Sequence, residues 1–151
     1  MTQPLINEKT SAPPEQDTGV SPEDRKTVLV VEDEGPLRVV ALRQLTDLGY
    51  QVLEAEDADS ALKLLESGKK IDLLFTDIVM PGRTNGMELA RITMKRWPLL
   101  KVVLTSGTAS GSDPLLEGLR LLGKPYLKKE LDKVLSEVFD GAAQTLLPVQ
   151  A

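Results

Sequence analysis

Five polar side chains stand at the ends of short apolar segments of this chain. They are Glu32, Asp33, Asp77, Thr105 and Lys124. A short apolar segment without polar alternation is typical of a strand buried on both faces, as in a parallel sheet covered by helices. The carboxyl ends of parallel strands meet at one edge of the sheet, where open α/β sheets bind ligands. The five side chains are therefore predicted to converge on one site.

The predicted site would join three carboxylates to a hydroxyl and an ammonium group. Two carboxylates at ~4 Å repel each other by about 4 kcal/mol at a surface-like dielectric, so Glu32, Asp33 and Asp77 need a cation or a shared proton. Carboxylate oxygens favour Mg²⁺, which takes one or two carboxylates and keeps several waters. Thr105 and Lys124 could then neutralise the oxygens of a transferred phosphoryl group.

Each of these residues also has a simpler interpretation when it is taken alone. Asp77 could cap the turn that follows it. Glu32 and Asp33 could complement the dipole of a following helix. Thr105 could be an ordinary β-branched strand residue, and Lys124 a solvated surface charge. The placement of all five at strand ends is what favours a shared site.

Composition narrows the classes of function. The chain has 151 residues and a net charge of −5, which argues against direct nucleic-acid binding and against attachment to anionic membranes. It contains no His and no Cys, which excludes His-based acid–base chemistry, a His phosphodonor within the chain and thiol chemistry. No apolar segment reaches membrane-spanning length. We expect a cytoplasmic protein.

The elements that must position the site alternate between strand and helix. Strands are predicted at 27–31, 50–54, 71–77, 101–105 and 119–123. Helices are predicted at 36–48, 58–67, 87–97, 113–117 and 127–138. This alternation predicts an α/β fold with a doubly wound, five-stranded parallel sheet of order 2-1-3-4-5, flavodoxin-like, with helices on both faces. The helix at 113–117 would be shortened.

The apolar periodicity also predicts which helix faces are buried. For the first helix the predicted inner face is Leu37, Val40, Ala41, Leu45 and Leu48. For the helix at 87–97 it is Met87, Ala90, Met94 and Trp97.

Domain boundaries follow from composition. Residues 1–25 are rich in Pro and polar residues and are predicted to form a disordered arm. Residues 26–140 are predicted to form the domain, and 141–151 a flexible tail. The residues after 140 are too few for a DNA-binding module, so a stand-alone domain is expected.

Four motifs in this order resemble the signature sites of two-component receiver domains. They are Val30–Glu34, Phe75–Gly82, Leu104–Gly107 and Lys124–Tyr126. The resemblance covers roughly residues 25–140, and four motifs at these spacings make it specific.

The resemblance implies a role for each site residue. Asp77 would accept a phosphoryl group from the phosphohistidine of a sensor histidine kinase or a histidine phosphotransfer protein. Asp33 would bind Mg²⁺ directly, Glu32 mainly through water, and the Val79 backbone carbonyl would add a ligand. Thr105 and Lys124 would contact the phosphoryl oxygens. The family implies a signalling domain that assists its own phosphotransfer and dephosphorylation, rather than an enzyme.

Two features depart from the family pattern. Leu121 occupies the position, three residues before the lysine, where many members carry an aromatic switch residue. The segment 111–118 is short for a full helix. The usual switch and the usual dimer are therefore in doubt, and a monomer is expected before phosphorylation. The pattern is similar to receivers attached to, or working alongside, hybrid sensor kinases.

Two other functions stay open at this point. A phosphohydrolase of the haloacid dehalogenase type also forms an aspartyl phosphate, but such sites typically carry a second Asp two residues later, where this chain has Val79. A receiver-like interaction module that is never phosphorylated is the other alternative.

Overall fold

A computed structural model of the protein describes residues 24–80, 84–107 and 119–140. In this part of the chain, five parallel strands form one sheet in the order β2-β1-β3-β4-β5, which confirms the predicted topology. The strands are β1 (Thr27–Val31), β2 (Gln51–Ala55), β3 (Leu73–Asp77), β4 (Lys101–Ser106) and β5 (Arg120–Gly123). The helices are α2 (Gly35–Asp47), α3 (Ala58–Glu66), α4 (Gly86–Arg96) and α5 (Lys128–Phe139).

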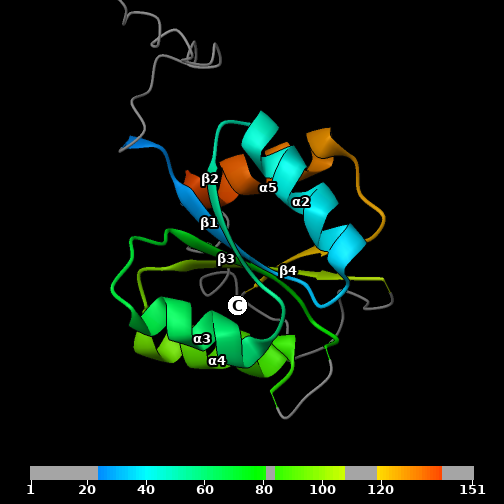
Figure 1. Cartoon of the computed structure of the whole chain (residues 1–151). Coiled ribbons are helices and arrows are strands. Elements are labelled where there is room, and N and C mark those ends of the chain that lie inside the picture. The colour runs from blue at the N-terminus through cyan, green and yellow to red at the C-terminus, as the bar shows by residue number, and fades with distance from the viewer. Residues whose placement is uncertain (1–23, 81–83, 108–118, 141–151) are drawn as a thin grey trace, which may run out of the picture.

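Helices cover both faces of the sheet, as Figure 1 shows: α2 and α5 lie on one side, and α3 and α4 on the other. The position of β1 inside the sheet, between β2 and β3, explains why its sequence is apolar after Thr27. Leu29 and Val31 pack toward α3 and α4, whereas Val28 and Val30 pack toward α2 and α5. Because successive side chains of a strand point to opposite faces, a strand between two helical layers has no polar position.

Local signals fix where the helices begin and end. Pro36 lies in the first turn of α2, where its missing N–H costs no hydrogen bond. Asp57 caps α3 by accepting a hydrogen bond from the Ser60 amide, and Asn85 caps α4 in the same way. Gly49 has a φ of 100°, in the left-handed region that lets the chain leave α2 and turn toward β2.

Some predicted boundaries and faces were wrong. β3 begins at Leu73 rather than at residue 71, and β5 at Arg120 rather than at 119. In α4, Met94 is 41% exposed, while Leu89 and Thr93 are buried. The reason is that α4 contacts α3 as well as β3 and β4, so its buried face is wider and rotated away from Met94.

The predicted inner face of the first helix was also partly wrong. Ala41 and Leu45 are buried as predicted, but Leu37 and Val40 are 41% and 53% exposed. These two side chains line a hollow between α2 and the segment Lys124–Tyr126, which is described below.

Several expectations fall on residues outside the described ranges. These are the short helix at 113–117, the predicted arm as far as residue 23, the tail at 141–151 and residues 81–82 of the motif Phe75–Gly82. The predicted domain boundaries stay predictions. Among the described residues, no helix is both long and apolar enough to cross a membrane.

Candidate functional site

Strand register brings the predicted site residues to one edge of the sheet. Asp77, the last residue of β3, is paired in register with Thr105 of β4. Glu32 continues directly from β1, and its backbone amide donates a hydrogen bond to Ala55 at the end of β2. Lys124 continues from β5, and its backbone amide donates to the Ser106 carbonyl at 2.9 Å. The carboxyl ends of β1, β3, β4 and β5 therefore lie around one site, where the sequence predicted the polar residues to converge.

The three carboxylates form one cluster. Glu32, Asp33 and Asp77 each offer an oxygen within 4.8 Å of the others, a spacing that could hold a metal ion. Glu32 and Asp77 are 6% and 8% exposed, and Asp33 is half-buried. Carboxylate oxygens without nitrogen or sulfur partners fit a hard cation such as Mg²⁺ rather than zinc or copper. The donor set therefore fits the predicted metal.

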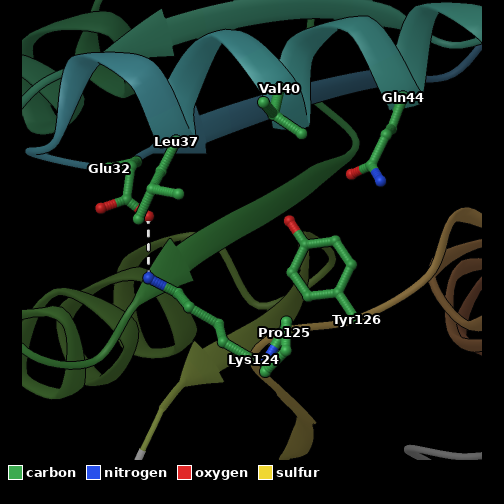
Figure 2. A pocket seen from close by; sticks show the side chains of 7 residues that line it. All are labelled: Glu32, Leu37, Val40, Gln44, Lys124, Pro125 and Tyr126. Atoms are coloured by element: carbon green, nitrogen blue, oxygen red, sulfur yellow. Dashed lines mark hydrogen bonds and ion pairs between the residues drawn. The ribbon is translucent and has the colours of Figure 1, made fainter.

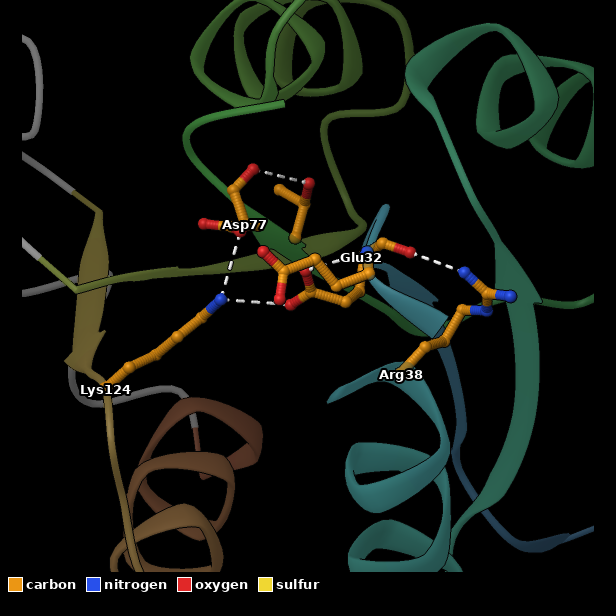
Figure 3. Close-up of polar contacts among 6 residues, drawn as sticks. Glu32, Arg38, Asp77 and Lys124 are labelled. Atoms are coloured by element: carbon orange, nitrogen blue, oxygen red, sulfur yellow. Dashed lines mark hydrogen bonds and ion pairs between the residues drawn. The ribbon is translucent and has the colours of Figure 1, made fainter. Parts of the chain in front are cut away.

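Lys124 links two members of this cluster. Its Nζ donates to Glu32 Oε1 and to Asp77 Oδ2, both at 3.0 Å, as Figure 3 shows. The side chain of Lys124 is 21% exposed, so these pairs are better shielded from water than an ordinary surface pair. The ammonium group therefore lies between the carboxylates of Glu32 and Asp77 and contacts both.

Burial and hydrogen bonding shift the pKa of two groups in the site, Glu32 and Lys124. Burial raises the pKa of Glu32 above its ordinary value, although hydrogen bonds from Lys124 and the Glu34 amide oppose it. For Lys124, burial lowers the pKa, but hydrogen bonds to Asp77 and Glu32 outweigh it and the net shift is upward. Lys124 is therefore held in its charged form beside the two acids.

A set of backbone contacts holds Asp77 at the end of its strand. The Asp77 carbonyl accepts a hydrogen bond from the Thr76 hydroxyl at 3.0 Å. The Ile78 amide donates to the Thr105 carbonyl at 2.9 Å, and the Gly86 amide donates to the Ile78 carbonyl at 2.8 Å. Three elements thus fix the backbone on both sides of the carboxylate.

Gly86 is a site residue that the sequence interpretation missed. A Cβ atom on Gly86 would overlap the Asp77 carbonyl oxygen and would lie 2.7 Å from the Asp77 carbonyl carbon. Only glycine lets the first residue of α4 approach β3 this closely. The available signal was a glycine at a helix start, where neither a turn nor a C-cap requires one.

The remaining predicted residues occupy varied environments. Thr105 is 4% exposed at the end of β4, beside Asp77 in register. Val79 lies two residues beyond Asp77 and has a 66% exposed side chain. Leu121 is half-buried and packs on the α3–α4 side of the sheet. The Lys124–Pro125 peptide bond is cis.

A hollow of about 340 Å³ opens beside the acidic cluster (Figure 2). Glu32, Leu37, Val40, Gln44, Lys124, Pro125 and Tyr126 line it. Tyr126 packs edge-on against Phe75 with ring centroids 6.1 Å apart, and burial raises the pKa of its hydroxyl to about 12. Apolar side chains such as Leu37 and Val40 thus line part of the hollow, and Glu32 and Lys124 of the charged site line another part.

Comparison with known proteins gives a consistent result. A family model described as "Response regulator receiver domain" matches residues 28–136. The chain is 34% identical over 119 residues to the sensor kinase CckA of Brucella abortus, a match covering 76% of this chain and 12% of that protein. It is 34% identical over 105 residues to the phosphate regulon transcriptional regulatory protein PhoB of Pseudomonas aeruginosa, covering 69% of this chain and 45% of PhoB. The chain thus spans less than half the length of these relatives.

Solved structures agree with this match. A response regulator receiver protein from Sinorhizobium medicae superimposes with a TM-score of 0.70 at 27% identity, covering 79% of this chain and 98% of that one. The response regulator protein TrrA of Thermotoga maritima, solved in complex with Mg²⁺-BeF, superimposes with a TM-score of 0.69 at 30% identity. That match covers 75% of this chain and 98% of TrrA.

Proposed function

The chain belongs to the response regulator receiver domain family, and on that premise we propose that Asp77 is the acceptor of a phosphoryl group in two-component signalling. The observation that carries the proposal is the contact of Lys124 with both Asp77 and Glu32, at 3.0 Å each, beside a third carboxylate. An acid that is nearly buried, paired with a cation and flanked by further acids is suited to receive an anionic group with a metal ion.

The chemistry would be a transfer between a phosphohistidine and a carboxylate. An Asp77 side-chain oxygen attacks the phosphorus, the P–N bond breaks, and its electron pair stays on the imidazole nitrogen of the donor. The product is an aspartyl phosphate. Lys124 would neutralise the negative charge on the phosphoryl oxygens, and the Thr105 hydroxyl would donate a hydrogen bond to one of them.

Mg²⁺ would be held by Asp33 and Asp77 directly, by Glu32 through water, and by the Val79 carbonyl. When bound, it would neutralise charge on the transferred phosphoryl group. The arrangement around Glu32 supports its indirect role. Glu32 Oε1 accepts from Lys124 and its Oε2 accepts from the Glu34 amide at 3.3 Å, so both oxygens already have donors.

The phosphodonor would be a sensor histidine kinase or a histidine phosphotransfer protein in the cytoplasm. A donor protein that brings its phosphohistidine to Asp77 must cover the surface beside the site. The hollow under Leu37 and Val40 supplies exposed apolar side chains there, and apolar contact area is what a protein partner requires. We also propose that the protein is a monomer before it is phosphorylated.

Phosphorylation with a small donor tests the proposal directly. With Mg²⁺ and acetyl phosphate, the protein should gain one acid-stable, base-labile phosphoryl group. Asp77→Asn should abolish the labelling, whereas Asp59→Asn, an equal charge change at an exposed position of α3, should leave it intact. Folding of both variants is checked by circular dichroism.

The outcomes separate the proposal from its rivals. Undiminished labelling of Asp77→Asn would overturn the assignment of the acceptor. Absence of both labelling and Mg²⁺ binding in the unaltered protein would favour an interaction module without phosphorylation. Multiple turnover of a phosphate ester would favour a phosphohydrolase.

A further inference from the structure

Arg38, in the first turns of α2, joins three elements at the edge of the acidic cluster. Its Nη1 donates to the Glu32 backbone carbonyl at 2.7 Å, and its Nε donates to Glu54 Oε1 on β2 at 2.9 Å. The Arg38 side chain is 20% exposed and that of Glu54 is 56% exposed. Figure 3 shows the guanidinium group on the side of Glu32 away from Lys124.

The carbonyl that Arg38 contacts belongs to the peptide group between Glu32 and Asp33. The Glu32 amide, one peptide earlier, is already fixed by its 3.2 Å hydrogen bond to Ala55. Once the Glu32 carbonyl is fixed as well, the peptide plane that connects the two acids has a set orientation. That orientation determines the direction in which the Asp33 side chain leaves the backbone.

The Glu54 contact explains how Arg38 can serve the site without opposing a metal ion. A guanidinium group near a cation site would by itself weaken metal binding through repulsion. Glu54 neutralises this charge from the far side and also restrains the guanidinium plane. Arginine can make both contacts because its donors form a planar fork, whereas a lysine ammonium is a single point of donation.

We propose that Arg38 is a positioning residue for the metal site, which it serves by orienting the peptide between Glu32 and Asp33. The inference rests on the proposed function, because it concerns the Mg²⁺ that this function uses. Arg38 touches neither the metal nor the phosphoryl group. Its effect is exerted through the backbone of the two acids.

If Arg38 is removed, its two possible effects change the Mg²⁺ affinity in opposite directions. Arg38→Met removes a positive charge and leaves Glu54 in place, so charge alone would tighten Mg²⁺ binding. Loss of positioning would weaken it. Groups that orient metal ligands typically contribute 10–100-fold to metal affinity, and we expect a weakening of about tenfold.

The test is isothermal titration of Mg²⁺ into the full chain and its variants, under conditions where all of them are folded. Arg38→Met and Arg38→Met/Glu54→Gln should both bind about tenfold more weakly, and the double change leaves the net charge as it was. Arg38→Lys should recover part of the affinity, because an ammonium group can still reach one acceptor. Glu54→Gln alone should change affinity by less than about threefold, as expected for an exposed pair.

A matched control comes from the opposite edge of the sheet. Arg96 and Glu66 form another Arg–Glu pair between two elements, with Nη1–Oε2 at 2.9 Å. Arg96→Met/Glu66→Gln should therefore leave Mg²⁺ affinity unchanged. A second readout needs no metal: in the metal-free protein, amide hydrogen exchange at Asp33 and Glu34 should accelerate in the Arg38 variants but not in the Arg96 control.

The results distinguish the inference from the proposed function. If Mg²⁺ binds the unaltered protein and Arg38→Met binds it equally well or more tightly, Arg38 is not a positioning residue. Unchanged amide exchange in the double variant would overturn the inference as well. If the unaltered protein binds no Mg²⁺, the proposed metal site is wrong, and Arg38 then has no metal site to position.

Discussion

Lys124 contacts two acids of the site through one ammonium group, and this gives it two opposing effects. It compensates the repulsion between Glu32 and Asp77 while the metal is absent, since it lies 3.0 Å from each of them. It also competes with any cation for the same oxygens. On the proposed function, this side chain would weaken metal binding while it supports the transfer of a phosphoryl group.

Replacing Lys124 by Met separates these two effects. Mg²⁺ should bind about fivefold more tightly or better, because a unit charge at ~4 Å is worth at least ~1 kcal/mol even in water. Phosphorylation by acetyl phosphate should slow about 10²–10³-fold, as when a group that stabilises a developing oxyanion is removed.

Lys128→Met is the matched control for this prediction. It removes an equal charge whose partner, Asp47, lies 3.7 Å away on the exposed surface. Titration calorimetry measures the Mg²⁺ affinity, and single-turnover labelling measures the rate of phosphorylation. Weaker Mg²⁺ binding by Lys124→Met would show that the ammonium supports the metal site instead of competing with it.

At the scale of secondary structure, the junctions between strands and helices hold the site. Gly35 and Gly86 are both the first residue of a helix that follows a site strand, yet their surroundings differ. A Cβ on Gly35 would meet nothing within 4 Å, whereas a Cβ on Gly86 would overlap the Asp77 carbonyl. The start of α4 is therefore packed directly against the backbone of Asp77.

Gly86→Ala should displace the end of β3. We expect it to lower the free energy of unfolding by about 1–3 kcal/mol, as for an overpacked site, and to reduce labelling of Asp77. Gly35→Ala should have little effect on either. Urea unfolding and acetyl phosphate labelling measure the two quantities. Full stability and full labelling of Gly86→Ala would show that the close approach is relieved without cost.

The N-cap of α3 should make the stability of the folded protein depend on pH in a predictable direction. The hydrogen bond from the Ser60 amide lowers the pKa of Asp57 below its ordinary value of 3.8. A group with a lowered folded-state pKa contributes stability above its unfolded-state pKa, and this contribution is lost as the pH falls through the folded-state value.

Asp57→Ala should therefore cost about 1 kcal/mol at pH 7, a typical value for a lost helix cap. The difference from the unaltered protein should shrink well below pH 3.8. Asp57→Asn keeps a capping oxygen and should be nearly as stable as the unaltered protein at pH 7. Urea unfolding at the two pH values is the measurement, and a pH-independent loss would contradict the capping role.

At the scale of the whole molecule, the sheet gathers negative charge at one edge. The cluster of Glu32, Asp33 and Asp77 lies at the carboxyl ends of β1 and β3, and Lys124 compensates only part of its charge. The folded state thus contains a repulsion that the unfolded chain does not have. A bound cation would relieve this repulsion and stabilise the entire domain.

Mg²⁺ should raise the thermal midpoint of unfolding. At 100 times the dissociation constant, a ligand that binds only the folded state adds about 2.7 kcal/mol, or roughly 5–15 °C for a domain of this size. Asp33→Asn should reduce this response and should make the metal-free protein slightly more stable. Calorimetry at constant ionic strength tests both points, and an equal Mg²⁺ response in Asp33→Asn would argue against this metal site.

The sequence by itself determined the topology and the identity of the polar residues at the site. Mostly apolar strands such as Thr27–Val31 and Leu73–Asp77, alternating with helices, are typical of a parallel sheet covered by helices on both faces. Once the sheet is parallel and its order is given, the residues that end the strands must lie along one edge. Composition and spacing along the chain were sufficient for these conclusions.

Tertiary structure decided what depends on the distance between residues far apart in the chain. No local pattern distinguishes Gly86 from Gly35, because the difference is the approach of α4 to the backbone of Asp77. The role of Arg38 depends likewise on contacts with Glu32 and Glu54, 6 and 16 residues away. Exposed Met94 and buried Leu89 differ because α4 packs against a second helix as well as the sheet. The apolar periodicity of a sequence predicts that a helix has a buried face, but the neighbouring elements determine how wide that face is and where it points.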